Sequence, residues 1–351
     1  MNQSIIGTLT FAYPGNLDLK TGGYGYDRRI LAELDASGWT INRLALGEGF
    51  PAPLLQTRRE AEDKLSALPD DALVIIDGLA FGIMGDWASK EADRLTIVAL
   101  VHHPLALETG LNADEHDRLL RQEKRALAFC RHVIVTSPNT RRELIAHYTV
   151  AEDKITIALP GTDPAPCATG NGTLAHIVSI GSLIPRKGHD ILIASLKEVE
   201  DLPWQATIVG SKRLAPQTAM ALEDLIHTSN LGDRIRLVGE IEDTSKILSK
   251  AHIFALASRY EGYGMVFAEA LSYGLPIVAC KAGAIPEVVP AGAGHLVPID
   301  DTEAFASALR ALLESPTLRK KMAAAAREAS RGLPGWADSA QIISKRLETL
   351  R

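Results

Sequence analysis

Two glutamates, Glu261 and Glu269, are separated by seven residues in the run YEGYGMVFAE. The apolar run Ile253–Leu256 before them predicts a buried strand, and a helix is expected to begin near Gly264. Glycines in the loop let backbone N–H groups approach a ligand, and a helix N-terminus favours an anion such as a diphosphate. The segment thus offers acceptors for sugar and ribose hydroxyls beside donors for phosphate, although a solvated loop and an exposed glutamate would also fit.

A second segment, GSLIPRKG from Gly181 to Gly188, follows the predicted strand Ala175–Ile180 and precedes a helix. Its two cations, Arg186 and Lys187, stand at the end of that strand. Such a pair can neutralise the charge that develops on a departing diphosphate, and electrostatic stabilisation of this kind often contributes more to catalysis than any other effect. The alternative interpretation is a solvated basic turn.

The first half of the chain carries two weaker signals. Gly22 and Gly23 lie between the first predicted strand and its helix, where their N–H groups could cradle a phosphate or simply form a turn. His102 and His103 end the strand that begins at Ile97. A single histidine there would more often be structural, whereas a pair at the carboxyl end of a strand favours a functional role.

Apolar runs alternate with helical patterns twice along the chain, with a break over residues 160–173, PGTDPAPCATGNGT, that is typical of a linker. This alternation is typical of parallel sheets covered by helices on both faces. We therefore predict an α/β protein with two Rossmann-like, doubly wound domains facing each other across a cleft. The domains are expected at residues 1–165, 166–334 and, for a C-terminal helix that packs back on the first domain, 335–351.

The predicted strands of the two halves are Ile5–Phe11, Ile41–Leu46, Leu73–Asp77, Ile97–His102 and Val133–Thr136, then Ala175–Ile180, Gln205–Val209, Ile235–Val238, Ile253–Leu256, Pro276–Ala279 and His295–Val297. Ligands of doubly wound sheets bind outside the carboxyl ends of the strands, so the residues just after these strands are the candidates for chemistry.

Composition narrows the function classes. The 351 residues carry a formal net charge of -6, and the isoelectric point is about 6.0, which argues against a nucleic-acid partner. Three widely spaced cysteines support neither a disulfide framework nor a metal site. Neither a signal peptide nor a membrane-spanning run is recognisable, so we expect a cytoplasmic protein.

A basic run between Arg118 and Arg131 could touch anionic lipid and thus make peripheral membrane contact. Because Glu115, Asp117 and Glu123 interrupt it, a solvated helix face is the better interpretation. The oligomeric state is not predicted.

The stretch YEGYGMVFAEALSYGLPIVACKAGAIPEVV, residues 260–289, resembles the signature of the retaining family-4, or group 1, glycosyltransferases of the GT-B fold. The resemblance covers nearly the whole chain and is much stronger after residue 174. It implies that Glu261 contacts the hydroxyls of the donor sugar and that Glu269 contacts the nucleotide ribose. The backbone of Gly262, Tyr263, Gly264 and Met265 would contact sugar and phosphate.

The same resemblance assigns further residues and shows one departure. The family usually has an arginine where this chain has Ser182, so Lys187 keeps one diphosphate cation and Arg186 would have to supply the other from a different position. His102 would touch the transferred sugar or the acceptor hydroxyl. Loops with Gly239 and Ile241 would lie beside the nucleotide base.

The resemblance implies an enzyme, a retaining hexosyltransferase that moves a sugar from a UDP- or GDP-linked donor to an unidentified hydroxyl acceptor. The sequence contains no D-x-D triplet, and Lys187 and Arg186 could take a metal's role, so we expect no metal or other cofactor. The departing phosphate oxygen would take the acceptor proton. Alternatives on the same architecture are a sugar-nucleotide epimerase and a non-catalytic sugar-nucleotide-binding protein. A dehydrogenase is disfavoured because no G-x-G-x-x-G follows the first strand.

Overall fold

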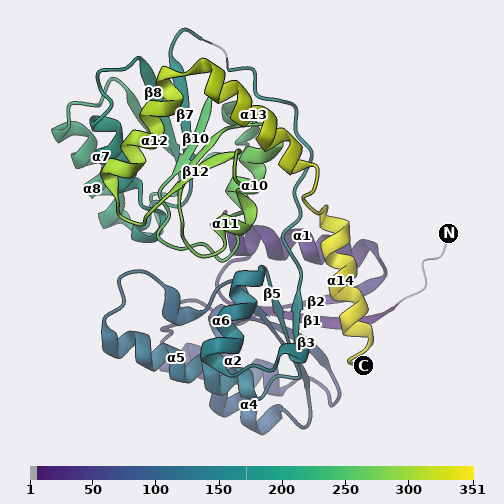
Figure 1. The fold of residues 1–351 in the computed structure, drawn as a ribbon. Coiled ribbons are helices and arrows are strands. Elements are labelled where there is room, and N and C mark those ends of the chain that lie inside the picture. Colours follow the sequence, from purple (N-terminus) through teal and green to yellow (C-terminus); the bar gives the residue numbers. More distant parts are fainter. Residues whose placement is uncertain (1–5, 171) are drawn as a thin grey trace. The chain divides into compact units, whose positions relative to one another are not determined.

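The computed structural model describes residues 6–170 and 172–351, which form two compact units (Figure 1). The first unit runs up to Gly161 and includes the chain again from Pro334 to Arg351. The second unit runs from Thr162 to Leu333. The division between the units therefore lies at residue 161, whereas the sequence predicted it at 165.

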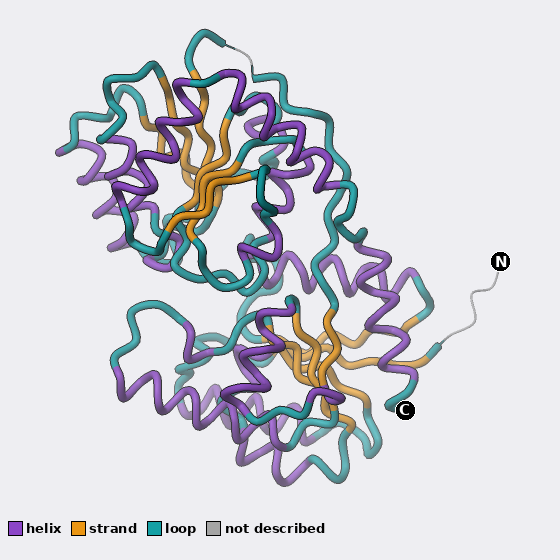
Figure 2. Tube along the Cα trace, viewed as in Figure 1, coloured by secondary structure: helices purple, strands orange, loops and turns teal. Residues whose placement is uncertain are grey.

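The first unit contains a six-stranded sheet in the order β2-β1-β3-β4-β5-β6, with every neighbouring pair parallel. Figure 2 shows strands in orange and helices in purple. Its strands are β1 (Gly7–Tyr13), β2 (Trp39–Ala45), β3 (Leu73–Asp77), β4 (Thr96–Val101), β5 (His132–Val135) and β6 (Ile155–Ile157). Every residue of β3 and β5 is buried, which explains their unbroken apolar runs. The sequence did not predict β6, because three residues are too few to show a pattern.

Helices cover this sheet: α1 (Gly22–Ala36), α2 (Leu55–Ser66), α3 (Gly78–Phe81), α4 (Gly85–Glu91), α5 (Ala113–Ala128), α6 (Pro138–Tyr148) and α14 (Trp336–Glu348). Local capping fixes where several of them begin. Thr21 accepts a hydrogen bond from the Tyr24 N–H to start α1, and Asn112 and Glu115 form a capping box at α5.

The C-terminal helix α14 is part of the first unit, where it packs against α1. The Trp39 indole N–H donates to Ser344 Oγ at 2.9 Å, and Ser339 Oγ donates to the Leu159 carbonyl at 2.5 Å. These bonds attach α14 to β2 and to the segment that follows β6. The C-terminal helix is therefore packed into the first unit.

The second unit also contains a six-stranded sheet, in the order β12-β11-β10-β7-β8-β9, and all of its neighbouring strands are again parallel. Its strands are β7 (Ala175–Ile180), β8 (Trp204–Val209), β9 (Ile235–Gly239), β10 (Ile253–Leu256), β11 (Ile277–Cys280) and β12 (Gly294–Val297). Its helices are α7 (His189–Lys197), α8 (Pro216–Thr228), α9 (Ser245–Leu248), α10 (Met265–Ser272), α11 (Ile285–Val288), α12 (Thr302–Glu314) and α13 (Pro316–Ser330).

Both sheets have a point where the strand order reverses. In the second unit the chain leaves β7 toward β8 and β9 and then returns to β10 on the other side of β7. In the first unit, β2 and β3 flank β1 in the same way. Loops diverge at such a switch point and leave room for a ligand outside the carboxyl ends of the strands. The loops after β7 and β10, and those after β1 and β3, are therefore the expected places for a site.

Candidate functional site

A cluster of opposite charges, with a buried carboxylate between two half-buried cations, lies in the second unit where β7 and β10 end. Lys187 Nζ donates to Glu261 Oε1 at 2.6 Å, and Arg186 Nη1 lies 3.8 Å from Glu261 Oε2. Ser258 Oγ also donates to Oε1, at 2.7 Å. Burial acts to raise the pKa of the Glu261 carboxyl, which is only 6% exposed, but the charges of Lys187 and Arg186 outweigh burial and hold it below its ordinary value. The site thus keeps an ionised carboxylate between two cations.

The turn that carries both cations is a short 3-10 helix, Pro185–Lys187, which ends at Gly188. Gly188 has a φ of +62°, and a Cβ there would lie 2.0 Å from the Ala257 carbonyl oxygen. Only glycine lets this turn lie against the end of β10. Two hydrogen bonds then join the segments, from the Arg259 N–H to the Arg186 carbonyl at 2.8 Å and from Arg186 Nη1 to the Tyr260 carbonyl at 3.1 Å.

Arg259 reinforces the same turn from outside. Its guanidinium donates to both carboxylate oxygens of Asp190, at 2.7 and 3.1 Å, and to Asp300 at 2.7 Å. It also donates to the Pro185 carbonyl. One arginine therefore links the start of α7, the turn before it and the loop after β12. The sequence predicted no role for Arg259, because nothing in its neighbours along the chain indicates these partners.

The loop that carries Glu261 is held by backbone contacts. The Ala284 N–H donates to the Glu261 carbonyl at 2.9 Å, and Gly283, with a φ of +51°, lies so close that a Cβ would be 2.3 Å from that oxygen. Gly264 has a φ of +95° and directly precedes α10, so the helix begins at Met265, as expected. Tyr263, which lies between Glu261 and Gly264 in this loop, is buried.

Glu269 lies inside α10 and has a different partner from Glu261. Thr244 Oγ1 donates to Glu269 Oε1 at 2.9 Å. Burial and the charges of Asp163 and Asp243 raise the pKa of the Glu269 carboxyl, against the lowering effect of Thr244. Thr244 was not predicted, and only its spatial closeness to Glu269 reveals it.

The remaining predicted residues of the second unit lie at strand ends. Ser182 is half-buried in the loop after β7, and its carbonyl accepts from the Ile184 N–H at 2.8 Å. Gly239 ends β9 with a φ of +74°, and its carbonyl accepts from the Gly210 N–H at 2.9 Å. Ile241, two residues later, is half-buried. Their expected contacts with phosphate and base stay predictions.

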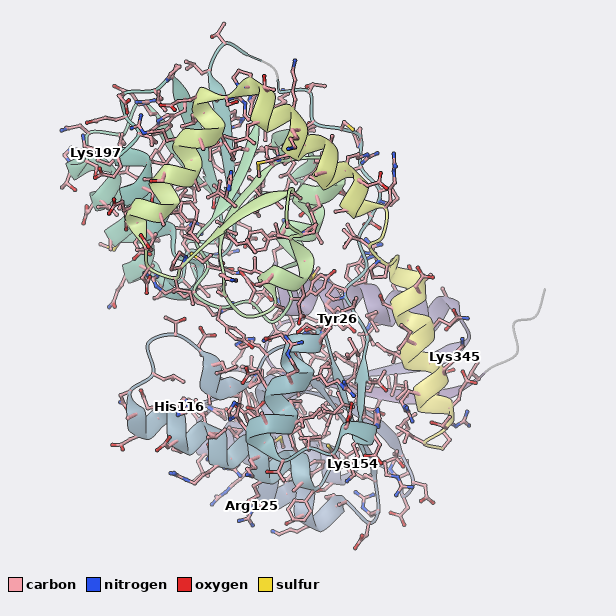
Figure 3. The ribbon with its side chains drawn as sticks, in the orientation of Figure 1. Tyr26, His116, Arg125, Lys154, Lys197 and Lys345 are labelled. Atoms are coloured by element: carbon pink, nitrogen blue, oxygen red, sulfur yellow. The ribbon has the colours of Figure 1, made fainter. Side chains whose placement is uncertain are left out.

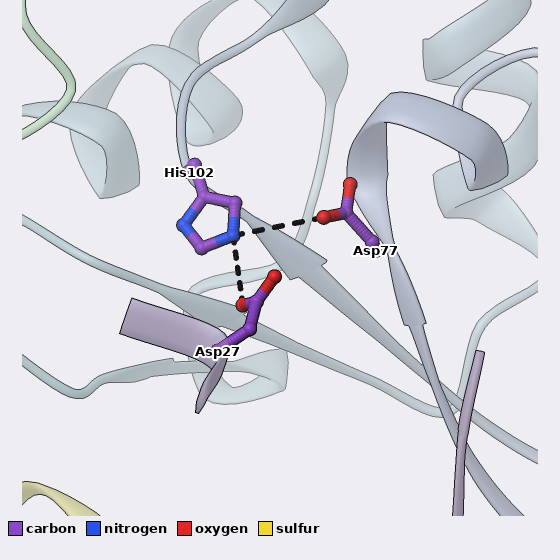
Figure 4. Close-up of side chains that lie close together, drawn as sticks. All are labelled: Asp27, Asp77 and His102. Atoms are coloured by element: carbon purple, nitrogen blue, oxygen red, sulfur yellow. Dashed lines mark hydrogen bonds and ion pairs between the residues drawn. The ribbon is translucent and has the colours of Figure 1, made fainter. Parts of the chain in front are cut away.

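A second cluster of titratable groups lies in the first unit. His102 Nε2 lies 3.1 Å from Asp27 Oδ1 and 3.8 Å from Asp77 Oδ2 (Figure 4). His102 follows β4, Asp77 ends β3, and Asp27 belongs to α1. Gly22 and Gly23 form the first turn of α1, and a Cβ on Gly23 would meet the His102 ring at 3.3 Å. His103 is separate from this cluster and lies 3.4 Å from Glu108.

The sequence pointed to His102 but not to Asp27 and Asp77, although two signals were present. Asp77 ends an unbroken apolar strand at its carboxyl end, which is where His102 also stands relative to β4. Asp27 falls on the buried stripe of α1 with Ile30, Leu31 and Leu34, where an acidic residue needs a partner.

Glu123 corrects an expectation about the basic helix. It was expected on a solvated face of α5, but only 1% of it is exposed. Its Oε2 accepts the Leu105 N–H at 2.8 Å and so caps the 3-10 turn Leu105–Leu107 that follows the two histidines. Burial raises the pKa of this carboxyl to about 8. Nearby Arg125, labelled in Figure 3, is exposed and pairs with Asp86 at 2.6 Å.

Two family models together match most of the chain. The model described as "Glycosyl transferases group 1" matches residues 170–329, and that described as "Glycosyltransferase Family 4" matches residues 43–165. A D-inositol 3-phosphate glycosyltransferase of Xylanimonas cellulosilytica is 30% identical over 291 residues, which cover 73% of this chain and 69% of the relative. The chain belongs to the group 1, or family 4, glycosyltransferases.

Other relatives of this glycosyltransferase are named for different activities. An MMP alpha-(1->4)-mannosyltransferase of Mycolicibacterium hassiacum is 26% identical over 294 residues, covering 76% of this chain and 68% of the relative. Matches to such relatives span about two thirds of their length. The predicted family is thus confirmed, while substrates differ among its members.

Solved structures show the fold. Sucrose-phosphate synthase from Thermosynechococcus elongatus superposes with a TM-score of 0.83 at 21% identity, covering 97% of this chain and 99% of that one. Anabaena HepE in complex with UDP-glucose gives 0.77 at 18% identity, covering 97% and 99%. The predicted α/β fold with two Rossmann-like units, of the GT-B type, is confirmed. No helix of residues 6–170 and 172–351 is long and apolar enough to cross a membrane.

Proposed function

We propose that this glycosyltransferase moves a hexose-type sugar from a UDP- or GDP-linked donor to a hydroxyl acceptor, with retention at the anomeric carbon and without a metal. The observation that carries the proposal is the cluster of Lys187, Arg186 and the buried Glu261 at the switch point of the second sheet. Two cations around one carboxylate leave a net positive site for a diphosphate. Two of the comparisons support the reaction class, because one relative is named a mannosyltransferase and one similar solved structure contains UDP-glucose.

In the proposed reaction the bond between the anomeric carbon and the diphosphate oxygen breaks, and the acceptor oxygen attacks on the same face. The departing phosphate oxygen takes the acceptor proton. Lys187 and Arg186 stabilise the negative charge that develops on the diphosphate, in the role that a divalent cation has in other enzymes. The backbone at the start of α10 adds donors directed at the same anion.

The two glutamates would bind hydroxyls and would not exchange protons with the reacting groups. Glu261 is kept ionised, so it accepts hydrogen bonds from the sugar while Lys187 turns to the diphosphate. Glu269 would bind the ribose through the oxygen that Thr244 does not occupy. His102 would contact the transferred sugar or the acceptor hydroxyl.

We also propose that the reaction takes place in the cytoplasm. Cys130, Cys167 and Cys280 are all free thiols, and two of them are buried. Free thiols of this kind suit a reducing compartment.

A donor screen tests the proposal. The full chain is incubated with UDP- and GDP-linked hexoses, and both donor hydrolysis and thermal midpoint are measured. A true donor raises the midpoint with its concentration, because it binds the folded state only. The Lys187→Ala variant should lose this shift, and Lys197→Ala, which removes a surface lysine of the same unit, should keep it.

Two outcomes would contradict the proposed function. Conversion of a donor into an isomer in the absence of any acceptor would identify an epimerase. A donor that stabilises the chain but is neither hydrolysed nor transferred to any hydroxyl acceptor would identify a binding protein.

A further inference from the structure

The cluster of Asp27, Asp77 and His102 concentrates buried negative charge. Asp27 is 1% exposed and Asp77 is 3% exposed. His102 lies beside both carboxylates, and its charge acts against burial to lower the pKa of Asp77. Buried carboxylates are costly without a cationic partner or a proton. The His102 imidazole lies within reach of both and becomes a cation once it is protonated.

Three elements build the cluster, each through a single residue. β3 and β4 are parallel neighbours, which brings Asp77 beside the end of β4, and α1 supplies Asp27 from the other side of the switch point. The Leu79 N–H donates to Asp77 Oδ1 at 2.7 Å and leaves Oδ2 directed at His102. One oxygen of Asp27 bonds the ring, while its other oxygen is buried without a hydrogen-bond partner.

The two nitrogens of the His102 ring lie in different surroundings. Nε2 is directed at both carboxylates, whereas Nδ1 points away from them (Figure 4). The Tyr26 ring packs edge-on against the imidazole, with 5.4 Å between the ring centroids. Thr136 Oγ1 donates a hydrogen bond to the His102 carbonyl at 3.1 Å. A fifth of the His102 side chain remains exposed. These contacts fix the ring plane and so fix where Nδ1 points.

We propose that Asp27 and Asp77 are positioning residues that hold His102 as an imidazolium with Nε2–H bonded to Asp27, so that Nδ1–H is presented to the substrate as a hydrogen-bond donor. This inference rests on the proposed function only for the identity of the substrate group. A histidine in this state cannot remove the acceptor proton. It donates instead to a hydroxyl oxygen of the sugar or the acceptor.

The electrostatics of the surroundings agree with this protonation state. Burial alone would lower the pKa of His102, but the charge and hydrogen bond of Asp27, with the charge of Asp77, raise it to about 9. Burial and the charge of Asp27 raise the pKa of Asp77 in turn. The other ionisable groups nearby are Tyr26, which packs on the ring, and Tyr24, whose pKa the same carboxylates help to raise.

A divalent metal is the competing occupant. One ligand atom from each of Asp27, Asp77 and His102 lies within 4.8 Å of the other two, a spacing that could also hold an ion. The Nε2 to Oδ1 distance of 3.1 Å already fits a direct hydrogen bond, which favours a proton in that space. The experiment therefore also tests whether Mn²⁺ binds at this cluster.

The test is an NMR titration of the full chain labelled at histidine, with the His102 resonance assigned by its loss in His102→Gln. We expect His102 to titrate near pH 9 in the parent protein, about 2.5 pH units above an ordinary histidine. Asp27→Asn should lower this midpoint by at least about 2 units, because it removes both the nearest charge and the charged acceptor. Asp77→Asn should lower it less. Asp86→Asn, which changes an exposed carboxylate of the same unit, is the matched control.

Activity gives a second readout. The fall of kcat on the alkaline side should move to lower pH in Asp27→Asn together with the NMR midpoint, and Asp27→Glu should restore part of it. If Asp27 had a purely structural role, Asp27→Asn would reduce kcat at every pH and would not shift the pH at which kcat falls.

Three results would overturn the proposal: a parent midpoint near that of an ordinary histidine, a midpoint that Asp27→Asn leaves unmoved, or stoichiometric broadening of the His102 resonance by Mn²⁺ with loss of activity on chelation. If Asp27→Asn does not fold, the parent titration and Asp77→Asn still decide. The titration needs no turnover, so failure of the proposed reaction is seen separately.

Discussion

Each unit places reactive side chains near the point where the strand order of its sheet reverses, but the two clusters differ in charge and in how their residues come together. In the second unit two cations from one turn, Arg186 and Lys187, lie beside Glu261 from a second short segment. In the first unit two carboxylates surround His102, and each of the three residues comes from a different element. The positive site suits an anion such as a diphosphate. The negative site stabilises a single protonated ring that can donate to a neutral hydroxyl.

The difference teaches that a site is readable in a sequence when its residues are close along the chain, whatever its chemistry. Lys187 and Glu261 lie within motifs whose spacing carries information. Asp27 and Asp77 are isolated acidic residues in an otherwise ordinary helix and strand. Four changes, from the largest expected effect to the smallest, sharpen or break this contrast.

Lys187→Ala should have the largest effect. Removing the cation nearest Glu261 takes away stabilisation of the leaving diphosphate, and loss of one such group costs about 10²–10³-fold in kcat. The measurement is transfer rate at saturating donor, with Lys197→Ala as the control. A Lys187→Ala enzyme within about threefold of the parent would remove the positive site from the mechanism.

Gly188→Ala should destabilise the second unit. The added Cβ would lie 2.0 Å from the Ala257 carbonyl oxygen in a backbone with a φ of +62°. Gly110→Ala in the first unit is the matched control, since its φ is +89° but nothing lies within 4 Å. Both variants carry backbone strain of about 1–3 kcal/mol, and only Gly188→Ala adds the clash. Its thermal midpoint should fall further, by about 2–4 °C for each extra kcal/mol; equal midpoints would mean that the turn adjusts freely.

Glu123→Gln should change how stability depends on pH in the first unit. Folding raises the pKa of Glu123 from about 4.5 to about 8. The favourable contribution of Glu123 to the free energy of unfolding is therefore complete below pH 4.5 and is lost as the pH rises through 8. Relative to the parent, the glutamine variant should gain thermal midpoint between pH 5 and pH 9. A difference between the two proteins that is constant with pH would show that Glu123 ionises normally.

Thr244→Val should have the smallest effect. It removes the hydrogen bond that holds Glu269 Oε1. A bond of this kind contributes about 0.5–1.5 kcal/mol, so KM for the donor should rise about two- to tenfold with little change in kcat. Thr228→Val removes a hydroxyl that bonds only backbone carbonyls of α8 and serves as the control. A fall in kcat with unchanged KM would separate Glu269 from donor binding.

Most of the fold could be predicted because strands and helices show their periodicity locally. The predicted bounds of the strands Leu73–Asp77, Ala175–Ile180 and Ile253–Leu256 agree with the structure at both ends. The first strand was expected at Ile5–Phe11 and is observed at Gly7–Tyr13; Ile5 lies outside the described residues. Three residues of β6 carried too little pattern to be recognised.

The site was predictable only in part, because tertiary partners leave no mark on neighbouring positions. The sequence suggested a role for Arg186 beside Lys187, and the structure brings both to Glu261. It could not show that Arg259 ties the turn to Asp190. Glu123 was predicted on the solvent side because a charged residue between basic ones is usually exposed. In the structure its carboxylate accepts the Leu105 N–H, a partner that is distant in the sequence.

Titration calorimetry of UDP and GDP against the full chain tests the central claim most directly. We predict that one of these nucleotides binds the parent and Lys197→Ala with equal affinity, and binds Lys187→Ala at least about tenfold more weakly, equivalent to about 1.4 kcal/mol. Equal affinity for the parent and Lys187→Ala, or no binding of either nucleotide to the parent, would contradict it.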